Sequence, residues 1–262
     1  MTSETTRDRF DLTGRVALVI GGSSGIGRAI ALGLADAGAD VVASSRRSRE
    51  VAEIAKEIRA KGRRSLAITS DVLERATLEN LHAEAVAALG KVDILVNAAG
   101  TTKRVPTLEL PEKDWRTMLR TNLTGMFHAC QIVAPGMVRQ GWGRIINIAS
   151  LATFVAFFEV AAYGVSKAGV GALTKSLAIE LARDGVCVNA IAPGFFPTEL
   201  NEMLLENTPR GREVLMRTPM GRYGRLEELV GTAVFLASES ASFITGQILA
   251  VDGGFLASGV NQ

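Results

Sequence analysis

The stretch Val16-Ala-Leu-Val-Ile20-Gly21-Gly-Ser-Ser-Gly25-Ile-Gly27 decides the fold of this chain. Its first five residues form a short apolar run, which is typical of a buried strand. Residues 28–37 have the composition of a helix, so the order is strand, glycine-rich turn, helix. Such a turn lets the backbone approach a pyrophosphate, and the helix start supplies amide donors. The alternative is a tight turn without a ligand. The candidate cofactor contacts in this turn are Gly21, Ser23, Ser24, Gly25, Ile26 and Gly27.

Strands and helices alternate along the rest of the chain. Further strands are predicted at 39–45, 65–69, 92–96, 142–149, 186–191 and 248–251, and helices at 50–61, 77–89, 112–137, 161–183 and 227–237. This order predicts an α/β fold, a single-domain Rossmann-like, doubly wound, seven-stranded parallel sheet with helices on both faces. No repeat or linker divides residues 1–262. The polar segment 198–220 is expected to be a substrate lid with a short helix at 199–206.

Composition excludes several classes of protein. The chain has 262 residues, is 47% hydrophobic and carries a formal net charge of +2, without a basic block that would suggest nucleic acid. Cys130 and Cys187 are the only cysteines, and His82 and His128 the only histidines, so we expect no disulfide framework and no metal site. We expect a cytoplasmic protein, because residues 1–15 lack the apolar core of a signal peptide and no transmembrane run follows.

The end of the second predicted strand indicates which dinucleotide the chain binds. A carboxylate at this place would bind the ribose hydroxyls of NAD, but the chain carries Ser44, Ser45, Arg46 and Arg47. Guanidinium groups suit a 2′-phosphate, because their donors match the phosphate oxygens. The sequence therefore favours NADP(H), with NAD possible, through Ser45, Arg46 and Arg47. The alternative is a solvated basic loop.

A second decisive stretch, Tyr163-Gly-Val-Ser-Lys167, lies in a predicted helix. Residues at i and i+4 project from one face of a helix. A nearby ammonium stabilises a phenolate, so we expect the tyrosine pKa to fall towards neutrality from about 10. Tyr163 could then act as a general acid or base. The alternative is a half-buried tyrosine beside a solvated lysine. From the residues alone, Asn122 in the preceding long helix reads as a surface or capped residue.

Taken together, the motifs resemble the short-chain dehydrogenase/reductase family, over roughly residues 12–255. The motifs that carry this resemblance occur in the family's order: Gly21-x-x-x-Gly25-Ile-Gly27, Asp71-Val72, Asn97-Ala-Ala-Gly100, Asn122, Ser150, Tyr163-x-x-x-Lys167, Pro193-Gly194 with Thr198, and Asp252-Gly-Gly254. Two positions depart from the family pattern. Ile20 stands where a threonine is usual, and Ala98 replaces a second asparagine. Both changes look structural, so we expect cofactor binding to be retained.

The resemblance implies a role for each matching residue. Tyr163 would exchange a proton with the substrate oxygen, and Lys167 would lower its pKa and bind the nicotinamide ribose. Ser150 would hold the developing oxyanion. Asn122 would hold a water that links Lys167 to solvent. The cofactor contacts implied are Asp71 and Val72 at adenine, Asn97, Ala99 and Gly100 on the nicotinamide side, and Ile191, Pro193, Gly194 and Thr198 at the carboxamide.

The reaction that these residues imply is the interconversion of a secondary alcohol and a ketone by an NAD(P)-dependent oxidoreductase. The Lys103-Arg104 pair and the tract 195–202 look most like gluconate 5-dehydrogenases, which act on a sugar acid. Lys103 and Arg104 could bind its carboxylate or be a solvated basic turn. Phe154, Phe158 and Phe195 are further candidates for substrate contact.

Two other functions remain open. A 3-oxoacyl-carrier-protein reductase shares nearly every motif and would need a basic surface, which Arg210, Arg212 and Arg217 could provide. A non-catalytic dinucleotide-binding sensor is the alternative from another class. The resemblance also implies a homotetramer, in which a small-residue face formed by Gly164, Ala168, Gly171 and Ala172 would permit close helix packing. No membrane partner is expected.

Overall fold

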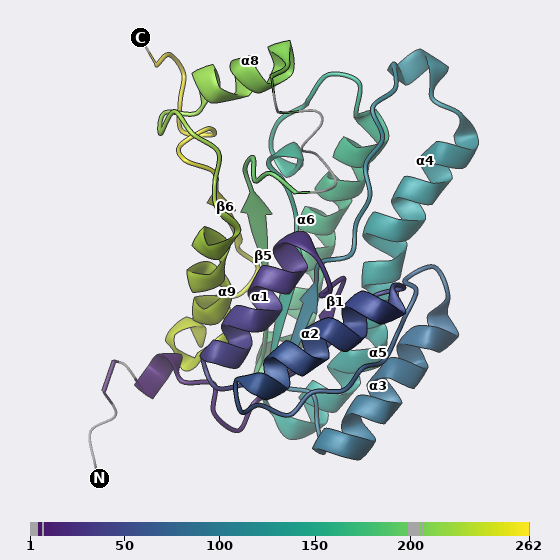
Figure 1. Cartoon of the computed structure of the whole chain (residues 1–262), viewed down its shortest axis with the longest axis vertical. Helices are drawn as coiled ribbons and strands as arrows, with labels where there is room; N and C mark the ends of the chain where they lie inside the picture. Colours follow the sequence, from purple (N-terminus) through teal and green to yellow (C-terminus); the bar gives the residue numbers. More distant parts are fainter. Residues whose placement is uncertain (1–4, 7, 199–204, 206, 262) are drawn as a thin grey trace.

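The computed structural model describes residues 5–6, 8–198, 205 and 207–261 (Figure 1). Six strands form one parallel sheet, and helices cover both of its faces. The elements are η1 (Asp8–Phe10), β1 (Val16–Ile20), α1 (Gly25–Asp36), β2 (Asp40–Ser44), α2 (Ser48–Ala60), α3 (Arg75–Leu89), β3 (Ile94–Asn97), η2 (Thr107–Glu109), α4 (Glu112–Leu119), η3 (Arg120–Thr124), α5 (Gly125–Gln140), β4 (Gly143–Ile148), η4 (Leu151–Thr153), α6 (Ala161–Leu181), η5 (Ala182–Asp184), β5 (Val186–Pro193), α8 (Pro209–Arg217), η6 (Leu226–Leu229), α9 (Val230–Ala237), η7 (Glu239–Ala241) and β6 (Ile248–Val251).

The strand order β2-β1-β3-β4-β5-β6 positions the site. The chain runs outward from β1 to β2 and then returns to β3 on the other side of β1. The order therefore reverses between β1 and β3, where Ile20 pairs with Asn97. In open α/β sheets, ligands bind in the crevice outside the carboxyl ends of the strands at such a reversal.

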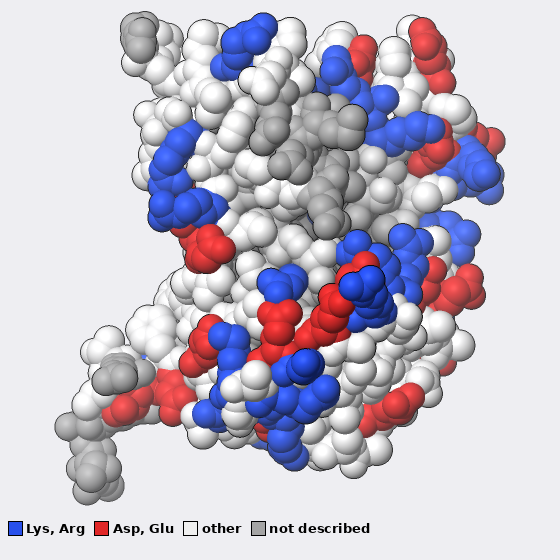
Figure 2. Space-filling view, viewed as in Figure 1, with Lys and Arg blue, Asp and Glu red and all other residues white. Residues whose placement is uncertain are grey.

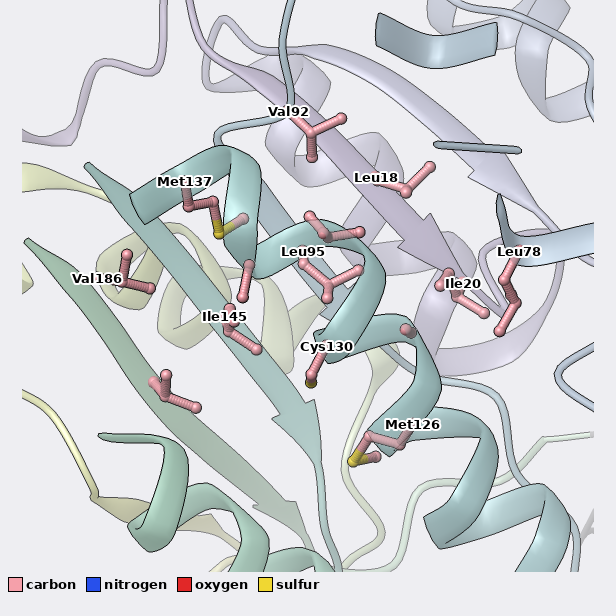
Figure 3. Close-up of a cluster of buried hydrophobic side chains, with 14 of the residues drawn as sticks. Leu18, Ile20, Leu78, Val92, Leu95, Met126, Cys130, Met137, Ile145 and Val186 are labelled. Atoms are coloured by element: carbon pink, nitrogen blue, oxygen red, sulfur yellow. The ribbon is translucent and has the colours of Figure 1, made fainter. Parts of the chain in front are cut away.

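Two hydrophobic cores lie on opposite faces of the sheet. Alternate residues of β1 serve different cores, because strand side chains point to alternate faces. Leu18 and Ile20 belong to the core under α3, α5 and α6, whereas Ala17 and Val19 belong to the core under α1, α2 and α9. Figure 3 shows the first core, where Met126, Cys130 and Met137 of α5 lie against strand residues such as Leu95 and Ile145. The expected doubly wound arrangement is therefore confirmed.

The strand predicted at 65–69 is wrong for the described residues, in which the sheet has six strands and not seven. The segment does run beside β2. Val41 N donates to Arg64 O (3.1 Å) and Ser70 N to Ser45 O (3.0 Å), and both bonds fit one parallel register. In that register Ile68 O would accept Ser45 N, but it accepts the Ser44 hydroxyl instead (2.6 Å). Among the described residues only these two backbone bonds join the segment to the β2 side, so no ladder forms between its two ends.

The long helix predicted at 112–137 is continuous but contains a π-helical turn. Its parts are α4, η3 and α5, and η3 is the π turn. Asn122 lies within η3 and is fully buried. A π turn inserted in an α-helix often marks a functional site. The surface or capped position that the sequence alone suggested for Asn122 is therefore wrong.

Two further expectations concern α6 and the lid. The predicted outward face of small residues on α6 is correct in part. Ala168 and Ala172 are exposed, but Gly171 is buried, and a Cβ on it would meet Thr153 and Ile248.

In the lid, α8 is the described helix, whereas the helix expected at 199–206 lies largely outside the described residues. Among the helices described, none has the length and apolar composition needed to cross a bilayer.

Candidate active site

A cleft of about 700 Å³ opens at the carboxyl edge of the sheet, around the reversal between β1 and β3. Loops after β1, β2, β3, β4 and β5 all contribute to it. Of the predicted site residues, the structure brings the following to its wall: Gly21, Ser23, Ser24, Gly25, Ile26, Gly27, Ser45, Arg46, Arg47, Asp71, Val72, Ala99, Gly100, Ser150, Tyr163, Lys167, Pro193, Gly194 and Thr198. Residues more than 170 positions apart in the chain thus share one cavity.

The glycine-rich turn is shaped for a phosphate group. Gly21 has a φ of +82°, and a Cβ on it would overlap the backbone at Ala99. A Cβ on Gly27 would overlap the Gly21 carbonyl, so the turn and the first turn of α1 touch without side chains. The N-cap residue Ser24 makes no side-chain cap, so the first amides of α1 remain available. These donors fit the pyrophosphate of a dinucleotide.

The ribose end of the cleft is polar and basic. Ser23 Oγ donates to Ser45 Oγ (2.7 Å), which also accepts Arg47 N (3.1 Å) and so ties the turns after β1 and β2 together. Arg46 and Arg47 are both exposed and line the cleft, and Arg47 Nε lies 3.6 Å from Glu50 Oε1. Figure 2 shows Lys and Arg side chains gathered where α2 begins. The residues present therefore fit a 2′-phosphate on the ribose.

Asn97 lies behind the cleft wall, although it was expected to flank the nicotinamide. Its side-chain nitrogen donates to Asn147 Oδ1 (2.9 Å) and Cys130 Sγ (3.5 Å), so it fastens β3 to β4 and α5 in the core. Burial raises the pKa of the Cys130 thiol to about 12.

At the opposite wall, Thr198 lies over the glycine turn, because a Cβ on Gly25 would meet it at 3.4 Å. The start of the lid segment thus reaches the phosphate turn.

Tyr163, Lys167 and Ser150 converge on the cleft from α6 and the end of β4. The Lys167 ammonium donates to Ile148 O (2.6 Å) and lies 5.7 Å from the centre of the Tyr163 ring. Ser150 Oγ accepts Ala152 N (3.1 Å), which holds this hydroxyl at the start of η4. The helical spacing of Tyr163 and Lys167 therefore places both on the cleft side of α6, as predicted.

The electrostatics of the pair differ from the expectation. Burial raises the pKa of Tyr163, and a hydrogen bond with Ser150 opposes that shift. Burial also lowers the pKa of Lys167 to about 8. The prediction that Lys167 lowers the tyrosine pKa is wrong for this structure, because the ammonium is directed at the Ile148 carbonyl and is itself destabilised by burial.

Asn122 is fixed one layer behind the cleft. Its Oδ1 accepts Thr101 N (2.8 Å), and its Nδ2 donates to Thr101 O (2.9 Å) and Ser166 Oγ (3.0 Å). Asn122 therefore joins η3 to α6 and to the loop after β3. A Cβ on Gly100 would lie 3.5 Å from Asn122 Oδ1 and 3.9 Å from Lys167 Nζ, so the two side chains meet on either side of this glycine.

The predicted substrate contacts lie outside the cleft wall. Lys103 pairs with Asp114 (2.6 Å) and Arg104 with Glu159 (2.7 Å), so neither is a free solvated cation. Phe154 and Phe158 are exposed. Phe195 packs against the rings of two further aromatic residues and lines a neighbouring cavity of about 180 Å³. The residue after it, Phe196, is buried and does line the main cleft.

Some residues at the cleft wall were not predicted. They are Ile20, Ser70, Leu73, Ala98, Thr117, Thr121, Ile148 and Ala149. Most of them neighbour a predicted residue in the chain, so the strand ends were a sufficient signal. Thr117 and Thr121 are different, because only the i, i+4 spacing on a helix at the cleft could have indicated them. The described residues contain no group of three or more His, Cys, Asp or Glu side chains arranged to hold a metal ion.

Comparisons with known proteins agree with this geometry. The model of a family described as enoyl-(acyl carrier protein) reductase matches residues 20–256. A 2-dehydro-3-deoxy-D-gluconate 5-dehydrogenase from Dickeya dadantii is 41% identical over 249 residues, 95% of this chain and 98% of that relative. A 3-oxoacyl-[acyl-carrier-protein] reductase from Staphylococcus aureus is 41% identical over 239 residues, 91% of this chain and 96% of its own.

A solved structure is equally similar. The gluconate 5-dehydrogenase from Burkholderia cenocepacia, in complex with NADP and tartrate, has a TM-score of 0.94 and 40% identity, covering 97% of this chain and all of that one. The matches span almost the full length of the relatives, and the ordered motifs meet in one cleft. The chain therefore belongs to the short-chain dehydrogenase/reductase family.

Proposed function

We propose that the protein is an NADP(H)-dependent oxidoreductase that interconverts a secondary alcohol and a ketone on a sugar acid. The observation that carries the proposal is the meeting of Ser150, Tyr163 and Lys167 in one cleft with the glycine-rich turn. A cleft of about 700 Å³ has the size of typical cofactor sites. When bound there, a nicotinamide supplies or accepts the hydride.

The side chains then have distinct tasks. In the reducing direction, the Tyr163 hydroxyl donates its proton to the substrate oxygen as the carbonyl carbon becomes tetrahedral. Ser150 donates a hydrogen bond to the same oxygen and stabilises its developing negative charge. Lys167, buried beside the ring, would hold the nicotinamide ribose. Asn122, which is fixed between Thr101 and Ser166, would hold a water on the way to Lys167.

The preference for NADP(H) is supported from two directions. Arg46 and Arg47 stand after β2, where NAD-binding proteins carry a carboxylate. A relative of 40% identity was crystallised with NADP. We propose that Ser45, Arg46 and Arg47 bind the 2′-phosphate, with Asp71 and Val72 at the adenine and Ala99, Gly100, Pro193, Gly194 and Thr198 around the nicotinamide.

The substrate class is supported by the relatives' names. Two of those described above are named as 5-dehydrogenases of gluconate or of 2-dehydro-3-deoxy-D-gluconate. The 3-oxoacyl-carrier-protein reductase remains the second candidate, because a relative with that name is equally identical to this chain. A parallel assay separates them: reduction of 5-keto-gluconate and of an acetoacetyl thioester, each with NADPH and with NADH. Turnover of the thioester alone would reject the sugar-acid proposal.

We further propose a cytoplasmic homotetramer in which the whole chain acts as one catalytic domain and residues 198–220 act as the lid. Exposed apolar residues on α5 and α6 support an interface there, namely Phe127, Val165 and Ile179. Ala168 and Ala172 on α6 would let a second helix approach closely. Light scattering at micromolar concentration tests the assembly, and a monomer would contradict it.

A further inference from the structure

The segment that carries Ser150 holds Lys167 at both ends. Before Ser150 in the chain, Ile148 O accepts a hydrogen bond from the Lys167 ammonium (2.6 Å). After Ser150, the Thr153 hydroxyl donates to Lys167 O (3.0 Å). Ser150 therefore lies between two hydrogen bonds to one residue of α6, and these bonds close a ring through residues 148–153. The ring limits how far this segment can shift along the helix.

Thr153 makes three contacts at this place. Its backbone N donates to Ser150 O (2.9 Å), which closes the turn of η4. Its hydroxyl reaches the Lys167 carbonyl on α6. Its methyl group lies over Gly171, one turn further along α6, where an added Cβ would come within 2.8 Å of it. Because Gly171 has no side chain, η4 can approach α6 closely enough for the hydroxyl bond to form.

The hydroxyl bond is additional to the regular hydrogen bonds of the helix. Lys167 lies within α6, where the helical pattern pairs its carbonyl with the amide of Gly171. A carbonyl oxygen has two lone pairs, so it can also accept the bond from Thr153. Thr153 itself does not line the cleft. Any effect of this hydroxyl on the reaction must therefore pass through the residues that do.

The position of Ser150 is the property that the bond controls. Ser150 Oγ accepts Ala152 N (3.1 Å), and a hydroxyl that accepts one bond still has its own proton to donate. A hydrogen bond between Ser150 and Tyr163 lowers the pKa of the tyrosine, so the two hydroxyl groups are close. Both must reach the same substrate oxygen, and a misplacement of about 1 Å can lower a rate by about a hundredfold.

We propose that Thr153 is a positioning residue, whose hydroxyl bond to Lys167 O holds the Ser150 hydroxyl in register with Tyr163. This inference rests on the proposed alcohol–ketone reaction and adds the residue that aligns its two parts, one at the end of β4 and one on α6. Without the hydroxyl, Ile148 O still holds the Lys167 ammonium, so cofactor binding is retained. The segment after Ser150 is no longer tied to α6, and the hydrogen bond from Ser150 to the oxyanion weakens.

The test compares Thr153→Val with Thr153→Ser. Valine keeps the branched shape and a methyl group over Gly171 but removes the hydroxyl, whereas serine keeps the hydroxyl. We expect Thr153→Val to lower kcat about tenfold or more at nearly unchanged KM, because the weakened interaction matters in the transition state. Thr153→Ser should restore most of the rate. The NADPH dissociation constant should stay unchanged in both variants.

Thr174→Val is the matched control. Thr174 is buried on the same helix, and its hydroxyl also donates to a carbonyl of α6, Val170 O (2.8 Å). Because this hydroxyl also accepts Asn147 Nδ2 (3.0 Å), its loss should lower the melting temperature more than Thr153→Val does, at nearly unchanged kcat. If both variants lose kcat in proportion to their fall in melting temperature, Thr153 has a structural role only and the inference is wrong.

A double-mutant cycle with Ser150→Ala tests whether Thr153 acts through Ser150. Thr153→Val should cost about tenfold in kcat when Ser150 is present and almost nothing when Ser150 is already alanine. An equal loss in both backgrounds would overturn the inference. The cycle is run on 5-keto-gluconate and on the acetoacetyl thioester. If only the thioester is reduced, the sugar-acid proposal fails while the cycle still decides the role of Thr153.

A readout without substrate separates this inference from the proposed function altogether. The chain has two tyrosines, so Tyr163→Phe identifies the Tyr163 signal in a tyrosinate absorbance titration by pH jump. Since the bond with Ser150 lowers the pKa of Tyr163, Thr153→Val should raise that pKa and Thr153→Ser should not. A raised pKa in a protein that reduces neither ketone would support the positioning role and reject the proposed function. An unchanged pKa would count against the positioning role whether or not a ketone is reduced.

Discussion

Replacing Lys167 by methionine should change how the stability of the ligand-free protein depends on pH. The ammonium is buried, and burial lowers its pKa to about 8, against 10.5 for a lysine in water. Below pH 8 both the folded and the unfolded chain carry this proton. The free energy of unfolding is then lowered by the full cost of burying the charged ammonium. Between pH 8 and 10.5 the folded protein has released the proton and the unfolded chain still binds it, so stability rises with pH.

The magnitude follows from the two pKa values. Where only the unfolded chain holds the proton, a rise of one pH unit adds about 1.4 kcal/mol to the free energy of unfolding. The wild type should therefore gain about 2 kcal/mol between pH 7 and 9.5 relative to Lys167→Met. The methionine variant also loses the bond to Ile148 O, which changes its stability by an amount that does not vary with pH. The difference in slope therefore isolates the titration of the ammonium.

The assay is urea unfolding at fixed protein concentration, at half-unit steps from pH 7 to 9.5, for the wild type and for Lys167→Met. Lys175→Met is the matched control, because Lys175 is exposed on the same helix. It should follow the wild type across the whole range. Parallel curves for the wild type and Lys167→Met would refute the claim that the buried ammonium releases its proton near pH 8.

Other predictions concern the proton donor, the phosphate turn and the cofactor preference. Tyr163→Phe should abolish turnover and leave NADPH affinity within about twofold, since the ring is kept and only the hydroxyl is lost; unchanged turnover would rule out Tyr163 as the proton donor, and a wild type that binds NADPH without turnover would favour the sensor. Gly27→Ala should prevent NADPH binding and lower the melting temperature, because its Cβ overlaps the Gly21 carbonyl, whereas Gly231→Ala, with open space around it, should do neither. Arg46→Ala should raise the KM for NADPH about tenfold and leave that for NADH unchanged; an equal rise for both would exclude a contact to the 2′-phosphate.

The sequence predicted the sheet well where a strand is buried on both faces. The apolar run of β1 and the glycines after it have one compatible structure, because only a tight turn can join that strand to α1. The edge segment 65–69 was predicted less well, since only two backbone bonds join it to the β2 side and the Ile68 carbonyl accepts a side-chain hydroxyl, that of Ser44. A bond of this kind depends on how two segments approach each other, which no local pattern records.

The candidate site was also predictable from the sequence only in part. Motif spacing brought Tyr163 and Lys167 to the cleft, because helical periodicity is a local property. The direction of the tyrosine pKa was not predictable in this way, since it depends on burial and on where the lysine ammonium points. The burial of Asn122 required knowledge of the resemblance, and its position in a π turn left no signal in the sequence.

The π turn at Arg120–Thr124 has a consequence for any attempt to shorten this chain. A π turn is in effect a single-residue insertion into an α-helix, so it rephases everything that follows it by about 100°, the rotation of one residue at 3.6 residues per turn. Deleting one residue here would leave a regular helix with every backbone bond made. It would also rotate Asn122 away from Thr101 and Ser166, or α5 away from the sheet. The protein would keep its helix and lose the alignment between core and cleft, so a deletion scan should find this turn intolerant even though its sequence is ordinary for a helix.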